Sequence, residues 1–180
     1  MLTLQIEKTE LYDEASERFL IVKPIELRLE HSLVSISKWE SKWKKPFLDR
    51  KAGKTLSESR DYVRCMTLNQ NVDPMVYHAL TAEHFKAVNE YIESEQTATC
   101  FNDTGKPSSR EVVTSEVIYY QMVAFGIPFE CQKWHLNRLL TLIRVCNIKN
   151  APSKKMGKKD IMAQNRALNA ARRARSGSKG

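Results

Sequence analysis

The sequence predicts a mainly helical α+β fold, with a small N-terminal antiparallel β-sheet, a helical body and a flexible basic C-terminal tail. Apolar and polar residues alternate near the N-terminus, as they do in half-buried strands. After Ser32 the apolar residues recur every three or four positions, as on one side of an amphipathic helix. The segment Lys149–Gly180 holds ten Lys or Arg and one Asp, so its charge of +9 accounts for the whole net charge of +8. We therefore divide the chain into a nearly neutral globular body, residues 1–148, and a basic tail, residues 149–180.

The expected sheet spans residues 2–30 and is built from short alternating stretches. These stretches are Leu2–Ile6, Phe19–Val22 and Ile25–Glu30. The polar segment Tyr12–Arg18 suits the connection of a hairpin. Pro24 lacks a backbone N–H donor, which favours an edge position or a bulge.

The helical part of the body, residues 32–148, begins with an amphipathic stripe. Its members are Leu33, Ile36, Trp39, Trp43 and Phe47. Ser35 and Glu40 fall on the opposite, polar side of this predicted helix, and Pro46 ends it. The stripe therefore predicts one amphipathic helix up to Pro46.

Capping signals predict three further helices. Thr55 and Glu58 have the spacing of a capping box. Asp73 followed by Pro74 is an N-cap with proline at the first helical position. Thr81 caps the helix after that. We expect a helix from each of these starts, the second of them a short one that ends at Leu80.

The segment Thr97–Pro107 predicts the one sizeable internal loop, with a turn at Asn102–Gly105 and flanks able to pair briefly as a strand. Ser108 and Glu111 have the spacing of a second capping box, ahead of a helix over Val112–Phe125. Gly126 suits the position just beyond the end of that helix.

Pro128 predicts a new helix, and Phe129–Ile148 is the most apolar stretch of the chain. Its apolar residues spread around most of the circumference, so we expect a central helix that is packed on more than one side. Lys158–Arg175 is rich in Ala, Arg and Lys and has the propensity for a helix. Its apolar face is thin, so such a helix is marginal in water without a partner.

The sequence contains no recognisable catalytic motif, which argues against an enzyme and against a bound cofactor. The four histidines fall on different predicted elements, and we interpret His135, beside Trp134, as a core or capping residue rather than a base or ligand. The four cysteines lack paired spacing, which favours free thiols of a reducing compartment over a metal site. No stretch approaches the roughly 20 apolar residues of a membrane span.

Two features have both a functional and a structural interpretation. Trp39, Trp43 and Trp134 could stack bases, but their helical spacing favours core packing. The tail could neutralise phosphates, or fold against an acidic protein helix, or serve only as a solubilising terminus.

Five segments resemble proteins encoded by long-tailed bacteriophages, and together they run through most of residues 27–175. The segments are Leu29–Glu40, Asp61–Leu68, Thr97–Thr104, Glu116–Cys131 and Trp134–Asn147. These proteins look like tail assembly chaperones, similar in role to the lambda G protein. The resemblance implies a non-enzymatic factor that binds the tape measure protein and recruits tail tube subunits. It also implies a place in the cytoplasm of the infected host and absence from the mature virion.

For such a chaperone we expect partner contacts from the long Pro128–Ile148 helix and from the basic segment. The candidate contact residues are Trp134, Leu136, Leu140, Lys158, Lys159, Arg166, Arg172, Arg173 and Arg175. Self-association is a further expectation, and we expect no membrane contact. The alternatives are a nucleic-acid-binding phage protein that uses its tail on phosphates, and a structural component of the virion.

Overall fold

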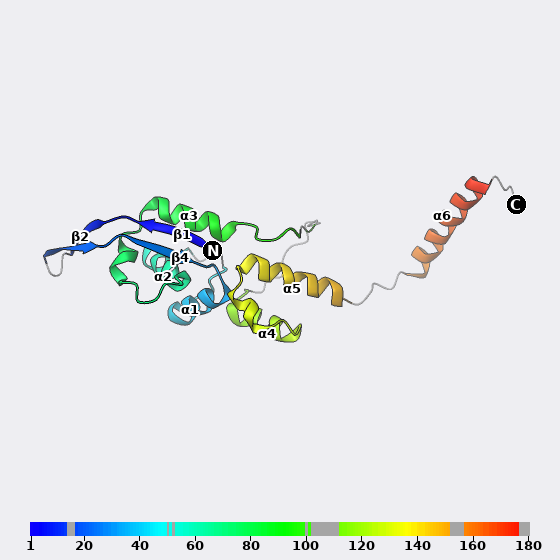
Figure 1. Ribbon diagram of the computed structural model, residues 1–180. Coiled ribbons are helices and arrows are strands. Elements are labelled where there is room, and N and C mark those ends of the chain that lie inside the picture. Colours follow the sequence, from blue (N-terminus) through cyan, green and yellow to red (C-terminus); the bar gives the residue numbers. More distant parts are fainter. Residues whose placement is uncertain are drawn as a thin grey trace. The chain divides into compact units, whose positions relative to one another are not determined.

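The computed structural model describes residues 1–13, 17–49, 51, 53–99, 101, 112–151 and 157–176. The chain divides into two compact units, Met1–Cys146 and Asn147–Gly180. The first unit combines four strands with helices, and the second contains helix α6 (Lys158–Ser176), so the mainly helical α+β fold is confirmed (Figure 1). The predicted Asn102–Gly105 turn and the Ser108–Glu111 capping box lie outside the described residues.

The N-terminal β region is a ribbon of two antiparallel pairs. Strand β1 (Leu2–Ile6) pairs with β4 (Ile25–Leu29), and β2 (Thr9–Asp13) pairs with β3 (Arg18–Val22). The two pairs are separate sheets, and the strand pairing is interrupted at Pro24, which has no N–H to donate. The alternation of β1 and β4 buries one face of their pair, with Leu4, Ile6, Leu27 and Leu29 in the core.

Strand β2 corrects the expectation that Tyr12–Arg18 is a hairpin connection. The backbone pairs Tyr12 with Phe19 and Asp13 with Arg18, so the ladder extends into that segment. The sequence signal is weak because one face of this pair is exposed, and hydrogen bonds to β3, rather than burial, hold β2 as a strand.

Helix α1 (Leu33–Trp43) begins at Ser32, whose side chain caps Ser35, and ends before Lys44, which has a left-handed backbone (φ 54°). The helix therefore ends at Trp43, before the predicted end at Pro46, because the chain turns back after Trp43. The Phe47 N–H donates to Glu40 Oε1 over 2.7 Å. Glu40 and Ser35 are both buried, which corrects their expected place on the polar side.

The next three elements begin at the predicted caps. Helix α2 (Leu56–Met66) has the Thr55–Glu58 capping box. A short 3-10 helix, η1 (Pro74–His78), follows Asp73, and helix α3 (Ala82–Glu93) is capped by Thr81. Figure 1 shows α3 alongside β1, which it contacts. After α2, Thr67–Asn69 covers the outer edge of β4, where Leu68 N donates to Arg28 O.

The second half of the first unit departs from the predicted boundaries. Helix α4 (Ser115–Ala124) is shorter than Val112–Phe125, and Gly126 follows it with the positive φ of 63° that favours glycine. The single helix expected over Phe129–Ile148 is two elements, a 3-10 helix η2 (Phe129–Lys133) and α5 (Leu136–Asn150).

The break between η2 and α5 has a cause in the fold. His135 forms a β-bridge with Ser32, and Leu136 N donates to His31 O over 2.7 Å. These contacts fix the chain in an extended form between the two elements. Helix α5 then buries Leu136, Leu139 and Ile143, and its half-buried Leu140, Leu142 and Cys146 also pack against the core.

Candidate protein-interaction surfaces

Helix α4 exposes large apolar side chains although it belongs to the folded unit. Ile118 and Met122 are fully buried, whereas Tyr120 is 72% exposed and Val123 is 64% exposed. Phe129, in η2, is 53% exposed and its ring lies 6.4 Å from that of Tyr119. We call Tyr120, Val123 and Phe129 the α4 face. A helix that is apolar all round is normally buried, so the α4 face is an unusual surface for a single chain.

A buried carboxylate fixes the start of α4 to the rest of the unit. Glu40 Oε2 accepts hydrogen bonds from the backbone N–H and the hydroxyl of Ser115, the first of these over 2.8 Å. Glu40 Oε1 accepts the N–H of Phe47. One side chain of α1 therefore ties down both the turn after α1 and the N-terminus of α4, where a negative charge is favourable.

The β2–β3 pair carries a second exposed apolar patch, made of Tyr12, Phe19 and Ile21. The three side chains lie on one face of the pair, because Tyr12 faces Phe19 and Ile21 faces Glu10 in the register. All three are more than half exposed, and the rings of Tyr12 and Phe19 lie 5.2 Å apart. The opposite face carries Leu20 and the buried Val22.

The basic candidate residues lie on α6, where the described side chains of Lys159, Arg166, Arg172, Arg173 and Arg175 are exposed. The side chain of Lys158 lies outside the described residues. Lys159, Arg166 and Arg173 are spaced by seven residues, or nearly two helical turns, so they form a stripe about 21 Å long at 1.5 Å per residue. Such a stripe suits an extended row of negative charges.

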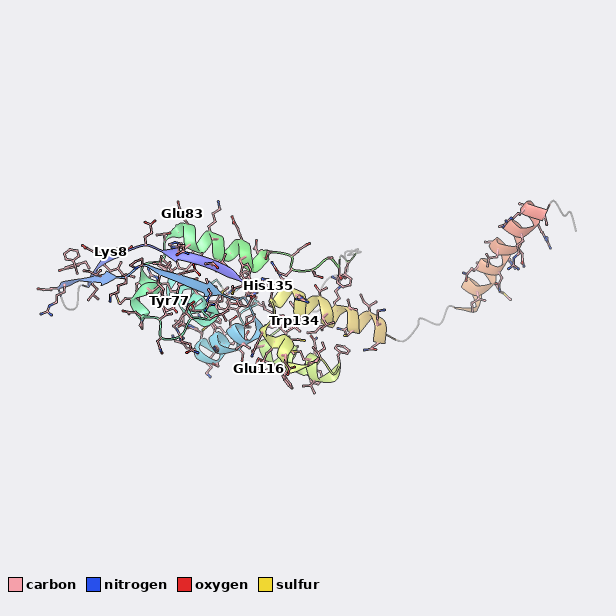
Figure 2. The ribbon with its side chains drawn as sticks, in the orientation of Figure 1. Lys8, Tyr77, Glu83, Glu116, Trp134 and His135 are labelled. Atoms are coloured by element: carbon pink, nitrogen blue, oxygen red, sulfur yellow. The ribbon has the colours of Figure 1, made fainter. Side chains whose placement is uncertain are left out.

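The apolar candidates Trp134, Leu136 and Leu140 lie at or near the start of α5, and they differ in exposure. Figure 2 shows Trp134 beside the start of this helix. Leu136 is in the core, while Trp134 and Leu140 are half-buried. The guanidinium of Arg138 lies 4.2 Å from the centre of the Trp134 ring, a cation–π contact. Trp39 is also in the core, so its predicted packing role is confirmed.

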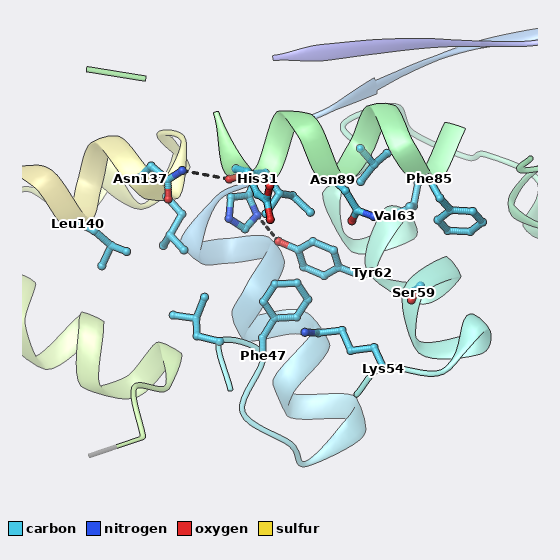
Figure 3. Close-up of a pocket in the computed structure, with 15 residues that line it drawn as sticks. His31, Phe47, Lys54, Ser59, Tyr62, Val63, Phe85, Asn89, Asn137 and Leu140 are labelled. Carbon is cyan, nitrogen blue, oxygen red and sulfur yellow. Dashed lines mark hydrogen bonds between the residues drawn. The ribbon is translucent and has the colours of Figure 1, made fainter. Parts of the chain in front are cut away.

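Two buried histidines join α5 to the junction of β4 and α1. His31 Nδ1 lies 2.5 Å from the Tyr62 hydroxyl, and its ring centre lies 5.2 Å from that of His135 (Figure 3 for His31 and Tyr62). His135 Nε2 donates to the carbonyl of Tyr91 over 3.0 Å. Burial, with the neighbouring His135, lowers the pKa of His31 to about 3, and burial also lowers the pKa of His135. Both rings are therefore neutral at neutral pH and act as packed, hydrogen-bonded core residues.

Across the described ranges, no group of three or more His, Cys, Asp or Glu side chains is placed to hold a metal ion. Cys65, Cys131 and Cys146 are free thiols. None of the helices that the structure describes is long and apolar enough to cross a membrane.

Sequence reasoning missed the α4 face and the patch on β2–β3. A signal for the first was present, since the run from Val117 to Val123 is too apolar for one helix face. The patch on β2–β3 has no such signal, because the polar residues that follow Tyr12 favour a loop. Comparison of this chain with protein-family models, curated proteins and solved structures finds no match.

Proposed function

We propose that this chain is a tail assembly chaperone of a long-tailed phage, a non-enzymatic protein that binds the tape measure protein and recruits tail tube subunits. The resemblance of its sequence to such proteins suggests this role. The α4 face is the single structural observation that supports it best, because a chaperone needs an adhesive surface on a stable scaffold. In this role the protein works in the host cytoplasm and is absent from the mature virion.

The composition of the α4 face is typical of a protein interface. Tyr and Phe are enriched in interface cores, and a few such residues supply most of the binding energy. Tyr120 and Val123 are exposed on α4 and Phe129 is exposed on η2, while Ile118 and Met122 of α4 are fully buried. The buried residues and the Glu40–Ser115 hydrogen bonds hold the helix in place, so the face is presented without further ordering of the helix.

The proposal is tested by co-expressing the chain with the tape measure protein of the same phage and isolating the complex by size exclusion. We expect Tyr120→Ser with Val123→Ser to weaken the complex at least 10-fold. A matched control is Leu68→Ser, which removes an aliphatic side chain that is also about half exposed, elsewhere on the body. Equal loss with the control variant, or no complex with the unaltered chain, would count against the α4 face as the binding surface.

Nucleic-acid binding through α6 is the second candidate, favoured by the stripe of Lys159, Arg166 and Arg173. About six to eight phosphate contacts give a log–log salt slope of roughly −5 to −7. Arg166→Gln with Arg173→Gln should then make the slope shallower by about two. Anisotropy titrations of duplex DNA and of RNA at several salt concentrations distinguish this candidate from a protein-binding tail.

A structural role in the virion is the third candidate, and it predicts the opposite location. Purified particles should contain a structural component and lack an assembly chaperone. Mass spectrometry of purified particles therefore separates the two, with the tape measure protein as the internal positive control.

A further inference from the structure

Two adjoining hollows form a groove between α2 and α3. The first hollow, about 770 Å³, is also bounded by the turn after α1 and by α5 (Figure 3). The second, about 680 Å³, continues between α2 and α3. Both are lined by Ser59, Phe85, Asn89 and Glu93, so they share a wall. We call the two hollows together the α2–α3 groove.

The groove is lined by both apolar and polar side chains, and part of it is open to solvent. The first hollow has Val63 and Val88 at buried positions and the half-buried Phe85, Ile92 and Leu140 around them. The second adds Leu56, which is more than half exposed. Grooves of this kind between helices accept the apolar side of an amphipathic helix.

Two cationic groups on the α2 side of the groove have no hydrogen-bond acceptor among the described residues. The Lys54 ammonium lies 4.2 Å from the centre of the Phe47 ring (Figure 3). It lies 5.9 Å from the centre of the Trp39 ring. Its neighbour Lys45, in contrast, pairs with Glu58. Arg60 lines the second hollow, and its Nε atom is buried without a partner. A buried donor normally finds an acceptor, so the Arg60 Nε atom indicates an acceptor that arrives with a ligand. Lys54 is exposed and interacts electrostatically with Glu58 and Asp49, and it adds positive charge to the same side of the groove.

The α3 side of the groove carries the opposite charge. Glu90 and Glu93 line it, together with Lys86, which lies 4.0 Å from Glu90. These carboxylates disfavour a polyphosphate such as a nucleic acid strand. A protein helix fits both sides, because it can turn a carboxylate toward α2 and keep other residues toward α3.

We propose that the α2–α3 groove binds an amphipathic helical segment of a partner protein, with apolar side chains in the two hollows and a carboxylate at Lys54 and Arg60. The proposal rests on the proposed chaperone function and names the chemistry of the segment that is bound. It assigns the partner helix to a surface other than the α4 face.

The site is tested first with two dyes on the full chain, one with aromatic rings and a sulfonate (1-anilinonaphthalene-8-sulfonate) and its uncharged analogue (N-phenyl-1-naphthylamine). Asn89 is exposed and lines both hollows, so we expect Asn89→Trp to weaken the binding of both dyes at least 10-fold. Glu83→Trp, exposed on the same helix and outside the groove, is the control. If the Asn89→Trp and Glu83→Trp chains bind the dyes with equal affinity, the α2–α3 groove is not the binding site.

The charge assignment is tested by Lys54→Gln with Arg60→Gln. We expect the anionic dye to bind about 5- to 10-fold more weakly while the neutral dye changes less than twofold, with Lys51→Gln as the control. If the affinities for both dyes fall by the same factor, Lys54 and Arg60 do not bind the anionic group.

The partner is tested with the tape measure protein, which should displace the anionic dye and bind the Asn89→Trp chain at least 10-fold more weakly. If it binds that variant as well as the unaltered chain, the groove is not its site, although the chaperone function stands. If it binds neither, the chaperone function and the assignment of this partner both fail, and the dye measurements alone decide whether the groove binds anionic apolar groups.

Discussion

Replacing Glu40 by alanine tests how the α4 face is attached to the body. Glu40 is 7% exposed and accepts three hydrogen bonds, from Phe47 N, Ser115 N and the Ser115 hydroxyl. A hydrogen bond to a charged group contributes about 1.5–3 kcal/mol, and a buried donor that loses its acceptor costs about 1–3 kcal/mol. Since some of these donors regain water when the side chain is removed, we expect Glu40→Ala to lower the free energy of unfolding by roughly 3–5 kcal/mol.

The assay is urea denaturation followed by circular dichroism, with the midpoint and slope compared between variants. Glu40→Gln should be intermediate, because an amide offers one acceptor oxygen where the carboxylate offers two. Glu90→Ala is the control, since that exposed carboxylate only approaches Lys86 at 4.0 Å, and it should change stability by less than about 0.5 kcal/mol. A loss below about 1 kcal/mol for Glu40→Ala would refute the attachment.

Three further predictions concern the core, the histidines and the tail. Leu27→Ala, at a fully buried core position, should cost about 2–5 kcal/mol in the same denaturation assay, whereas Ile21→Ala on the exposed face should cost well under 1 kcal/mol. The pKa of His31 is lowered to about 3, so the unfolded state binds more protons between that value and about 6.5, and stability falls as pH falls through this window. At pH 5 the loss from His31 is about 2 kcal/mol, and urea titrations of His31→Phe should show less pH dependence than those of the control His78→Gln. Deletion of residues 150–180 should leave a folded body, judged by an unchanged thermal midpoint, with weaker partner binding; loss of soluble folding would contradict the division into body and tail.

The local signals of the sequence predicted the element starts best, because caps depend on neighbouring residues alone. Thr55 with Glu58 and Thr81 start helices as expected, and Gly126 follows the end of α4 as expected, with a positive φ. The ends of the elements and the buried polar residues could not be predicted from such local signals. The helical periodicity of the sequence predicts that Glu40 lies on the surface. Its burial is explained only by the N–H groups of Phe47 and Ser115, which lie outside α1.

The break at His135 had the same kind of cause. The Phe129–Ile148 stretch is apolar enough for one helix, but the bridge between Ser32 and His135 is a contact between residues about a hundred positions apart. The basic candidate contact residues were predicted to lie on a helix, and the structure places them on α6. Sequence reasoning could not separate the buried Leu136 from the exposed Tyr120, because an apolar residue of the core and one of an interface have the same side chain.

The most direct test of the chaperone proposal is co-expression of the full-length chain with the tape measure protein of the same phage, followed by size exclusion at low and high salt. A chaperone of this kind should form a soluble complex as the unaltered chain, and the affinity should fall at least 10-fold with Tyr120→Ser and Val123→Ser but not with Leu68→Ser. A tape measure protein that stays insoluble with the unaltered chain would contradict the proposal.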